Sequence, residues 1–219
     1  MGSFRLPRST RGTSTRASEP QRRSPGFTLI ELLTVLAVIG LLVAILIPTA
    51  TSARIAAKRV KTKVQFSQWA AAMEQFRQEY GYYPAIDGGS GGRVLPDCFA
   101  GALTGQTLDG LGEASGSQLA GNARLLRFYH IAEGELNASR TALTDAFGNT
   151  DIAVIYDKNG DGMVSSADGA AVTVRGVETD AEFLPTGQNL DLSAGVRAGV
   201  IFYSAGNGTT PGDLVFSWK

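Results

Sequence analysis

The chain has 219 residues, with 20 basic and 20 acidic side chains, one cysteine and one histidine. The single cysteine, Cys98, excludes an intrachain disulfide, and His130 has no second histidine or cysteine with which to share a transition metal. Residues 1–26 contain six arginines and one acid, so the rest of the chain carries a net charge of about −5, which argues against nucleic acid as the principal ligand.

Residues 1–26 form a basic leader. Apart from its arginines the leader consists mostly of Ser, Thr, Pro and Gly, so it cannot bury apolar surface and we expect it to be disordered. Positive charge before an apolar segment is retained on the cytoplasmic side of a membrane. The leader therefore predicts that the part of the chain after the apolar segment is directed outward.

An apolar segment follows, from Phe27 to Ile47. Its 21 residues include only three polar ones, Thr28, Glu31 and Thr34. As a helix it would be about 30 Å long, which is the thickness of the hydrocarbon core of a bilayer. An ordinary secretory signal has a shorter apolar stretch and a small-x-small cleavage site after it, which is missing here. The segment predicts a transmembrane helix, and an uncleaved anchor is one interpretation of it.

The start of this segment carries a specific motif. Gly26 is followed by Phe27-Thr28-Leu29-Ile30-Glu31, by the apolar run and by Pro48. This motif resembles the processing signature of type IV pilins and of the pseudopilins of type II secretion systems. The resemblance implies that a prepilin peptidase cuts between Gly26 and Phe27 on the cytoplasmic side, removes the leader and methylates the new N-terminal residue, Phe27.

Glu31 is an unusual residue for a bilayer, where a charged side chain costs about 2.5–3.5 kcal/mol on insertion scales. The resemblance implies a role in assembly, because in a filament of staggered parallel helices the Glu31 carboxylate can meet the free amine of Phe27 in a neighbouring subunit. Such a contact is stronger in a low dielectric than in water. The alternative interpretation is that Glu31, near the end of the segment, only extends toward the interface.

The helix is expected to continue from residue 48 to residue 80, with a kink at Pro48, because proline removes one backbone hydrogen bond and crowds the preceding turn. A glycine and a proline after Tyr80 then end it. Five basic residues between 54 and 63 are expected on the outer side of the bilayer. Apolar residues at spacings of mostly three to five predict the face that packs on a globular domain. These residues are Ile55, Val60, Val64, Trp69, Met73, Phe76 and Tyr80.

Residues 81–219 are predicted to form a periplasmic globular domain. Its segment 87–118 is rich in Gly, Ser and Thr and predicts an irregular loop, whereas 118–130 predicts an amphipathic helix. Four β-rich runs begin at residues 152, 170, 199 and 213, and the last two are expected to form a hairpin. Residues 145–149 and the C-terminal Ser-Trp resemble segments of the major pseudopilin. The predicted fold class is α+β, a pilin-like long N-terminal helix packed on a small antiparallel sheet.

Residues 157–168, "DKNGDGMVSSAD", resemble a twelve-residue calcium-binding loop. Hard cations such as Ca²⁺ require many oxygen ligands, and this spacing places such ligands around one centre. The predicted ligands are Asp157, Asn159, Asp161, the Met163 carbonyl and Asp168.

Two further residues of this loop have expected structural roles. Gly162 would provide the sharp turn and Val164 would hold the loop to the sheet. The alternative interpretation is a polar β-turn, since Asn-Gly and Asp-Gly are common turn pairs. The resemblance to major pseudopilins implies a different calcium site, in the loop before the final strand, where Asn207 and Asp213 are the available oxygen ligands.

No catalytic arrangement of side chains is recognised, so we expect no enzymatic activity. The resemblance implies an inner-membrane pseudopilin that polymerises into a periplasmic pseudopilus and drives protein export by type II secretion. Its implied partners are other pseudopilins, the prepilin peptidase, the inner-membrane secretion platform and membrane lipid. One alternative is a type IV pilin of a surface filament for adhesion, motility or DNA uptake, although many pilins close their C-terminal loop with a disulfide. The other is a membrane-tethered calcium-binding module that does not polymerise.

Overall fold

The computed structural model describes residues 26–89, 92–187 and 189–218. The predicted basic leader lies outside the described residues, except for Gly26. The chain divides into two compact units, Met1–Ile47 and Pro48–Lys219.

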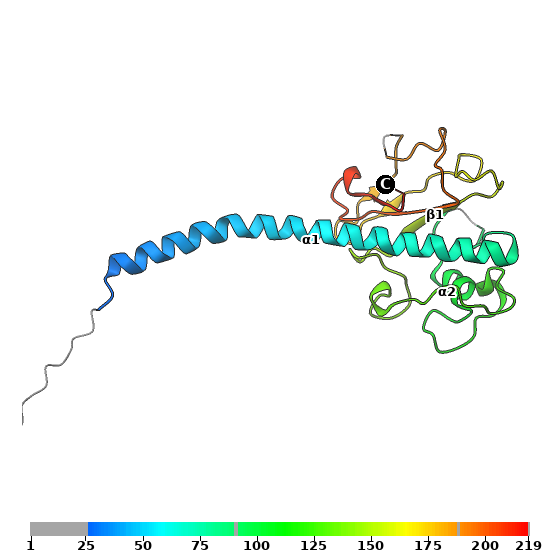
Figure 1. The fold of residues 1–219 in the computed structure, drawn as a ribbon, viewed down its shortest axis with the longest axis horizontal. Coiled ribbons are helices and arrows are strands. Elements are labelled where there is room, and N and C mark those ends of the chain that lie inside the picture. Colours follow the sequence, from blue (N-terminus) through cyan, green and yellow to red (C-terminus); the bar gives the residue numbers. More distant parts are fainter. Residues whose placement is uncertain (1–25, 90–91, 188, 219) are drawn as a thin grey trace, which may run out of the picture. The chain divides into compact units, whose positions relative to one another are not determined.

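The first unit contains the beginning of helix α1, whose bounds are Leu29–Tyr80 (Figure 1). Every described residue from 26 to 47 is exposed, and most of these side chains are apolar. Within the part of the chain that the structure describes, α1 is the one helix long and apolar enough to cross a membrane. The apolar surface of this unit is therefore available to lipid or to other helices.

Helix α1 runs through Pro48 without interruption. The proline has no N–H to donate, so the Ala44 carbonyl loses its bond from the residue four positions later. On the other side, the Ser52 hydroxyl donates to the Pro48 carbonyl at 3.0 Å. The local sequence thus tolerates a proline inside a long helix.

In the second unit, one face of α1 forms the centre of the core. Its buried residues recur every three or four positions, as an amphipathic helix requires. They are Thr62, Gln65, Phe66, Trp69, Ala72, Met73 and Phe76. The prediction of a packed face is confirmed for Trp69, Met73 and Phe76, which are fully buried.

The prediction was wrong for Val60 and Val64, which are 61% and 52% exposed. Each lies two positions from the buried Thr62, and two positions on a helix correspond to a rotation of about 200°. The apolar residues therefore keep a helical spacing along the sequence, but Val60 and Val64 lie on the opposite side of the helix from the buried face. Ile55 and Tyr80, at the two ends of the predicted face, are only partly buried.

The buried face of α1 packs against helix α2 (Pro96–Thr104) and against the main sheet. The Trp69 ring lies 4.7 Å from that of Phe99 on α2 and 5.6 Å from that of Phe202 on the sheet, measured between centroids. Aromatic rings at such distances add to the stabilisation from buried area. Trp69 therefore joins three elements at the centre of the core.

Helix α2 corrects the prediction of an irregular loop over 87–118. Its start carries Pro96 at the first helical position, and Gly105 follows its end with φ of +70°. A β-carbon at Gly105 would lie 2.7 Å from the Leu125 carbonyl oxygen, so only glycine fits there. Proline at the start and glycine after the end are helix signals that the surrounding Gly-rich composition obscured.

The helix predicted over 118–130 is absent, and this segment contains only the end of the 3-10 helix η1 (Gly116–Leu119). The cause is Asn122, whose side chain is fully buried. Its amide donates to the carbonyls of Ala102 and Leu126, and its oxygen accepts from the Leu126 N–H at 2.9 Å. These bonds hold the backbone in turns and replace the bonds of a helix.

The main sheet has three antiparallel strands in the order β1-β4-β5, and the predicted hairpin of the last two is confirmed. The predicted run at residue 170 contributes only β2, which pairs with β3 in a separate two-stranded sheet. The strands are β1 (Ile152–Tyr156), β2 (Val174–Arg175), β3 (Glu182–Phe183), β4 (Val200–Ser204) and β5 (Val215–Phe216). Two more 3-10 helices are η2 (Glu133–Glu135) and η3 (Pro211–Asp213).

Strands β1 and β4 are buried on both faces because the sheet lies between two clusters of side chains. Val154 and Phe202 face the cluster that contains α1 and α2, whereas Ile155 and Tyr203 face a second cluster over β2, β3 and the segment around Leu190. The predicted fold class, α+β with a long N-terminal helix and a small antiparallel sheet, is confirmed.

A buried polar network joins the turn at residues 145–149 to the end of β4. The Asp145 carboxylate accepts from the Asn149 amide at 2.9 Å and from the Ser204 hydroxyl at 2.7 Å. Asn149 also donates to the Gly206 carbonyl at 2.8 Å and accepts from the Val177 N–H at 2.9 Å. Since buried polar groups are costly when unpaired, these bonds fix how the chain enters β1 and leaves β4.

Candidate processing and assembly site

Residues 26–28 precede helix α1 and have no regular secondary structure. Gly26 is exposed, and the Phe27 side chain is 80% exposed. A β-carbon added at Gly26 would meet no atom within 4 Å, so the fold itself does not require glycine there. The bond between Gly26 and Phe27 therefore lies in accessible, non-helical chain, which is a form that a peptidase can bind.

Thr28 and Glu31 form a reciprocal cap at the start of α1. The Glu31 carboxylate oxygen Oε2 accepts from the Thr28 N–H at 2.8 Å and from the Thr28 hydroxyl at 2.7 Å. The Thr28 hydroxyl oxygen in turn accepts from the Glu31 N–H at 3.3 Å. This is the arrangement of a capping box, which satisfies backbone donors at the first turn of a helix. This role was not among the two predicted for Glu31, assembly and extension to the interface, although Thr and Glu three positions apart are its signal in the sequence.

The cap uses only one of the two carboxylate oxygens. Within the described residues, Glu31 Oε1 accepts no hydrogen bond, whereas Oε2 accepts two. A carboxylate has about four acceptor positions, so the capped Glu31 can still accept from a cation supplied by another molecule. Capping the helix and pairing with an external amine are therefore compatible.

The predicted calcium loop, residues 157–168, is folded through hydrogen bonds within itself. The buried Asp157 accepts from the Gly160 N–H at 2.6 Å and the Gly162 N–H at 2.8 Å. The buried Asp168 accepts from the Lys158 N–H and the Ser165 N–H, both at 2.8 Å. Burial raises the pKa of Asp168, but its backbone and side-chain donors together lower it more, so the pKa lies below its ordinary value.

Two of the predicted ligands, Asn159 and Asp161, lie together in one turn of the loop. The exposed Asn159 amide donates to Asp161 at 3.0 Å, and Asp161 accepts from the Met163 N–H at 2.9 Å. Val164 is fully buried and exchanges two backbone bonds of 2.8 Å with Val196, so it holds the loop to a neighbouring segment and not to a strand of the main sheet. Among the described residues, His, Cys, Asp and Glu side chains form no group of three that could hold a metal.

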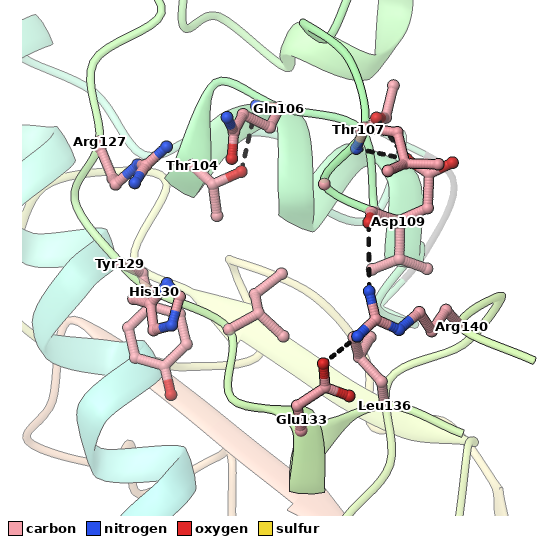
Figure 2. Close-up of a pocket in the computed structure, with 14 residues that line it drawn as sticks. Thr104, Gln106, Thr107, Asp109, Arg127, Tyr129, His130, Glu133, Leu136 and Arg140 are labelled. Carbon is pink, nitrogen blue, oxygen red and sulfur yellow. Dashed lines mark hydrogen bonds and ion pairs between the residues drawn. The ribbon is translucent and has the colours of Figure 1, made fainter. Parts of the chain in front are cut away.

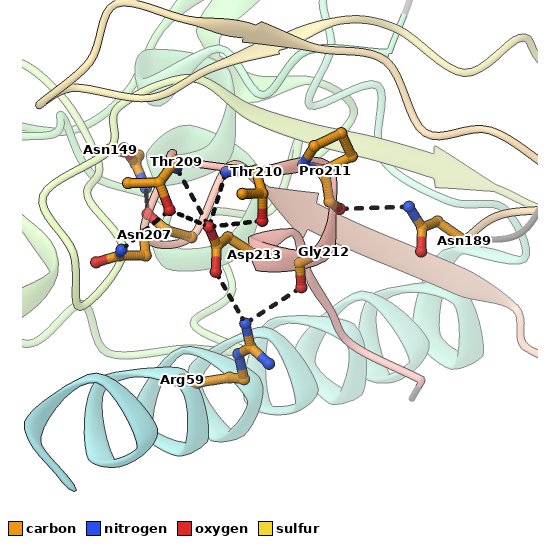
Figure 3. A network of polar contacts seen from close by, with 10 residues as sticks. Arg59, Asn149, Asn189, Asn207, Thr209, Thr210, Pro211, Gly212 and Asp213 are labelled. Atoms are coloured by element: carbon orange, nitrogen blue, oxygen red, sulfur yellow. Dashed lines mark hydrogen bonds and ion pairs between the residues drawn. The ribbon is translucent and has the colours of Figure 1, made fainter. Parts of the chain in front are cut away.

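The alternative calcium loop, before β5, is organised around Asp213 (Figure 3). One carboxylate oxygen of Asp213 accepts from the N–H and the hydroxyl of both Thr209 and Thr210. Its other oxygen lies 3.5 Å from Arg59 Nη2 of α1. Asn207 contacts the same loop through Thr209, at 3.4 Å. This carboxylate thus already has a cationic partner within the protein.

An open cleft of about 350 Å³ lies between residues 104–111 and residues 127–140 (Figure 2). On one side Arg140 donates to the Glu133 carboxylate and, at 3.5 Å, to the Asp109 carbonyl. Arg127 and His130 line the other side. No sequence motif predicted this cleft, and none of the predicted site residues lines it.

Comparison with known proteins identifies one feature. Residues 21–47 match the family model described as the prokaryotic N-terminal methylation motif. No curated protein and no solved structure matches the chain. The motif is the prepilin signal of type IV pilin-like proteins, which are structural subunits, and it implies processing by a prepilin peptidase and assembly into pilin-type filaments. The match ends at Ile47, so it covers the segment that contains Gly26, Phe27 and Glu31 and none of the second unit.

Proposed function

We propose that this chain is a pseudopilin that polymerises into a periplasmic pseudopilus and drives protein export by type II secretion. The observation that carries the proposal is the capped Glu31 carboxylate at the start of an exposed apolar helix, directly after the predicted cleavage position. A structural subunit needs a membrane anchor, a contact that selects its neighbours and a folded domain. The chain offers one candidate for each.

Assembly follows from the energetics of the first unit. Cleavage after Gly26 would leave a cationic amine on Phe27, one residue before the helix cap. In lipid, neither this amine nor the Glu31 carboxylate is stable alone, because a buried unpaired charge costs several kcal/mol. Pairing Glu31 Oε1 with the Phe27 amine of a neighbouring copy would satisfy both charges and fix the stagger between the two helices.

A type IV pilin of a surface filament is the alternative within the same class, and the motif is common to both kinds of subunit. The single cysteine favours the pseudopilin, since a C-terminal disulfide cannot form. A membrane-tethered calcium-binding module that never polymerises is the alternative outside this class. It predicts a chain that remains monomeric in the membrane.

The test is deletion of the chain's gene in its own host, followed by two measurements. Loss of exported proteins from the culture medium, with surface filaments unchanged, supports the pseudopilin. Loss of surface filaments with normal export supports the pilin. If both are normal and the chain cannot be cross-linked to copies of itself, the non-polymerising module is the better assignment. Complementation with wild type, which must restore the lost property, is the control.

A further inference from the structure

The second unit has an uneven distribution of charge along its sequence. Residues 54–63 contain five basic residues and no acidic one, whereas residues 64–219 contain nine basic and eighteen acidic residues. The basic residues are Arg54, Lys58, Arg59, Lys61 and Lys63. All of them lie on α1, in the part of the unit that follows the apolar segment most closely.

Three of these residues form one continuous face. Arg54, Lys58 and Lys61 are spaced by four and then three positions, so they project from the same side of the helix. All three are exposed. The Lys58 ammonium lies 5.5 Å from the centre of the Phe147 ring, which leaves its charge unneutralised.

Arg59 is the contrasting case, because it projects from a different side of the helix and pairs with Asp213. None of the ion pairs among the described residues involves Arg54, Lys58 or Lys61. Lys61 interacts electrostatically with the mostly buried Glu135, without forming an ion pair. Arg54 and Lys58 therefore present cations without an ion pair among the described residues, and Lys61 adds a third cation that the Glu135 interaction offsets only in part.

We propose that the face formed by Arg54, Lys58 and Lys61 binds the anionic phospholipid headgroups of the bilayer that the apolar segment enters. This inference rests on the membrane anchoring in the proposed function and does not depend on polymerisation. The partner is identified by charge and by proximity.

Proximity follows from the length of chain that separates the face from the apolar segment. Arg54 comes seven residues after Ile47, a helical rise of about 10 Å, and Lys58 and Lys61 come about 16 and 21 Å after it. The headgroup layer extends roughly 5–7 Å beyond the hydrocarbon core, and charges interact over a Debye length of about 8–10 Å. Arg54 and Lys58 lie within this range even if the helix stands along the bilayer normal, and a tilt toward the basic face brings Lys61 closer.

The distribution of charge also favours one orientation of the domain relative to the membrane. An anionic surface attracts the basic face and repels acidic residues elsewhere in the unit, so it favours orientations that turn the basic face toward the membrane. The acidic residues of a second copy are a possible partner by charge alone. They are not tethered beside the basic face, however, whereas the bilayer is always present at a high effective concentration.

The test measures lipid selectivity with the full chain. The chain is reconstituted into phosphatidylcholine bilayers that contain spin-labelled phosphatidylglycerol or spin-labelled phosphatidylcholine. Electron paramagnetic resonance then gives the fraction of each label immobilised next to the protein. We expect phosphatidylglycerol to be preferred by about fivefold, the factor that corresponds to one cation–headgroup attraction of ~1 kcal/mol. The preference should fall toward one as salt shortens the Debye length from about 30 Å at 0.01 M to about 3 Å at 1 M.

Two variants with equal changes in charge test whether the preference for phosphatidylglycerol comes from the basic face. The test variant combines Arg54→Gln, Lys58→Gln and Lys61→Gln, and should lose most of the preference. The control variant changes three exposed cations elsewhere in the unit, and should keep the preference. The control substitutions are Arg127→Gln, Lys158→Gln and Arg197→Gln. Wild type and variants are compared in the same processing state, so that the basic leader contributes equally.

Three results would overturn the proposal. The first is a wild type without preference for phosphatidylglycerol, and the second is an equal loss in both variants, which would show an effect of net charge alone. The third is a preference that occurs only at high protein density, which would assign the basic face to contacts between copies. A chain that prefers phosphatidylglycerol and never polymerises would refute the proposed filament function and leave the lipid-binding face standing.

Discussion

Arg59 and Asp213 connect helix α1 to the loop before the last strand. Arg59 Nη2 lies 3.5 Å from an oxygen of the Asp213 carboxylate and 3.3 Å from the Gly212 carbonyl oxygen to which it donates. The two residues are 154 positions apart, so this contact closes nearly the whole second unit. Both side chains are partly exposed, at 38% and 18%, which limits the strength of the ion pair.

The first prediction separates the two roles of Asp213. Asp213→Ala removes the acceptor for Thr209 and Thr210 as well as the ion pair, and should lower the free energy of unfolding by about 1–2 kcal/mol. Asp213→Asn keeps one oxygen that can accept from the threonines but loses the charge and the oxygen that faces Arg59, so it should cost about 0.5–1 kcal/mol, as should Arg59→Ala. Chemical unfolding of the full chain in detergent, followed by tryptophan fluorescence, provides the measurement. Equal losses for the Ala and Asn variants would show that the threonine bonds contribute nothing.

The long helix was predictable because its signals are local. Apolar composition over 27–47 and the glycine after Tyr80 act within a few residues, and no distant contact competes with them. The face of the helix near Val60 and Val64 was not predictable, because it depends on where the domain begins to cover the helix. Periodicity alone cannot locate that point.

In the middle of the chain, by contrast, a distant contact outweighs the local sequence signal. The pattern over 118–130 satisfied helical periodicity, but one buried side chain, Asn122, took the backbone bonds that a helix would have used. That choice depends on a contact with α2, which the sequence pattern does not contain. At the candidate site, similarly, the motif indicated the importance of Glu31, whereas the cap with Thr28 became clear only from the distances between atoms.

The second prediction concerns processing. Gly26→Ala should block cleavage, because the resemblance implies a peptidase that needs a residue without a side chain before the cut. Folding should be unaffected, since a β-carbon at Gly26 meets no neighbouring atom within 4 Å. Mass spectrometry of the membrane form measures the N-terminus. Wild-type protein that still carries residues 1–26 would contradict the pilin-like assignment.

The third prediction concerns assembly and uses the cap to separate two roles of Glu31. Glu31→Gln retains a capping acceptor and loses the charge, whereas Thr28→Val removes most of the cap and retains the charge. If charge pairing drives assembly, Glu31→Gln and Glu31→Ala should be cleaved but should fail to form filaments, and Glu31→Asp should be intermediate. Thr28→Val should still assemble.

Cross-linking of copies in the membrane gives the yield of filaments for each variant. Normal assembly by Glu31→Gln would show that the charge is dispensable. Failure of Thr28→Val together with normal assembly of Glu31→Gln would assign the role of Glu31 to the helix cap alone.

The fourth prediction retains calcium as a proposal for residues 157–168. We expect weak binding, with a dissociation constant of roughly 10⁻⁴–10⁻³ M, because Asp168 is shorter than the usual closing glutamate. At ~100-fold excess over that constant, calcium would add about 2.7 kcal/mol to the stability of the fold. Thermal unfolding of the full chain with calcium or with chelator tests this.

The choice of variants matters because Asp157 also accepts backbone bonds within the loop. Asp157→Ala with Asp161→Ala should destabilise the chain even without calcium, so only the difference between calcium and chelator is informative. Asp161→Ala alone changes an exposed residue and should abolish that difference. Asp191→Ala, in another exposed turn, is the matched control.

If the stabilisation by calcium survives in every loop variant, the ion binds elsewhere, with Asn207 and Asp213 as the next candidates. No response in wild type would favour a simple turn.

The last prediction concerns Glu135, which lies in the core beside α1 and is only 7% exposed. Burial raises the pKa of Glu135 above its ordinary value, and this effect exceeds the opposing effect of its donors, the Tyr129 hydroxyl and the Ala132 N–H. A carboxyl group whose pKa is higher in the folded state stabilises the fold below its unfolded pKa, and that contribution is lost as pH rises through the folded pKa. Glu135→Gln removes the charge; its amide oxygen can still accept from the Ala132 N–H, while its NH2 group donates to the Tyr129 hydroxyl oxygen. The free energy of unfolding of this variant, minus that of wild type, should therefore increase as pH rises from about 4 to 7.

Denaturant unfolding of both chains at several pH values measures this difference. The contributions of the other carboxylates, such as Asp168 and Asp213, are the same in both chains and cancel. A difference that is independent of pH would show that Glu135 ionises as readily in the fold as in the unfolded chain.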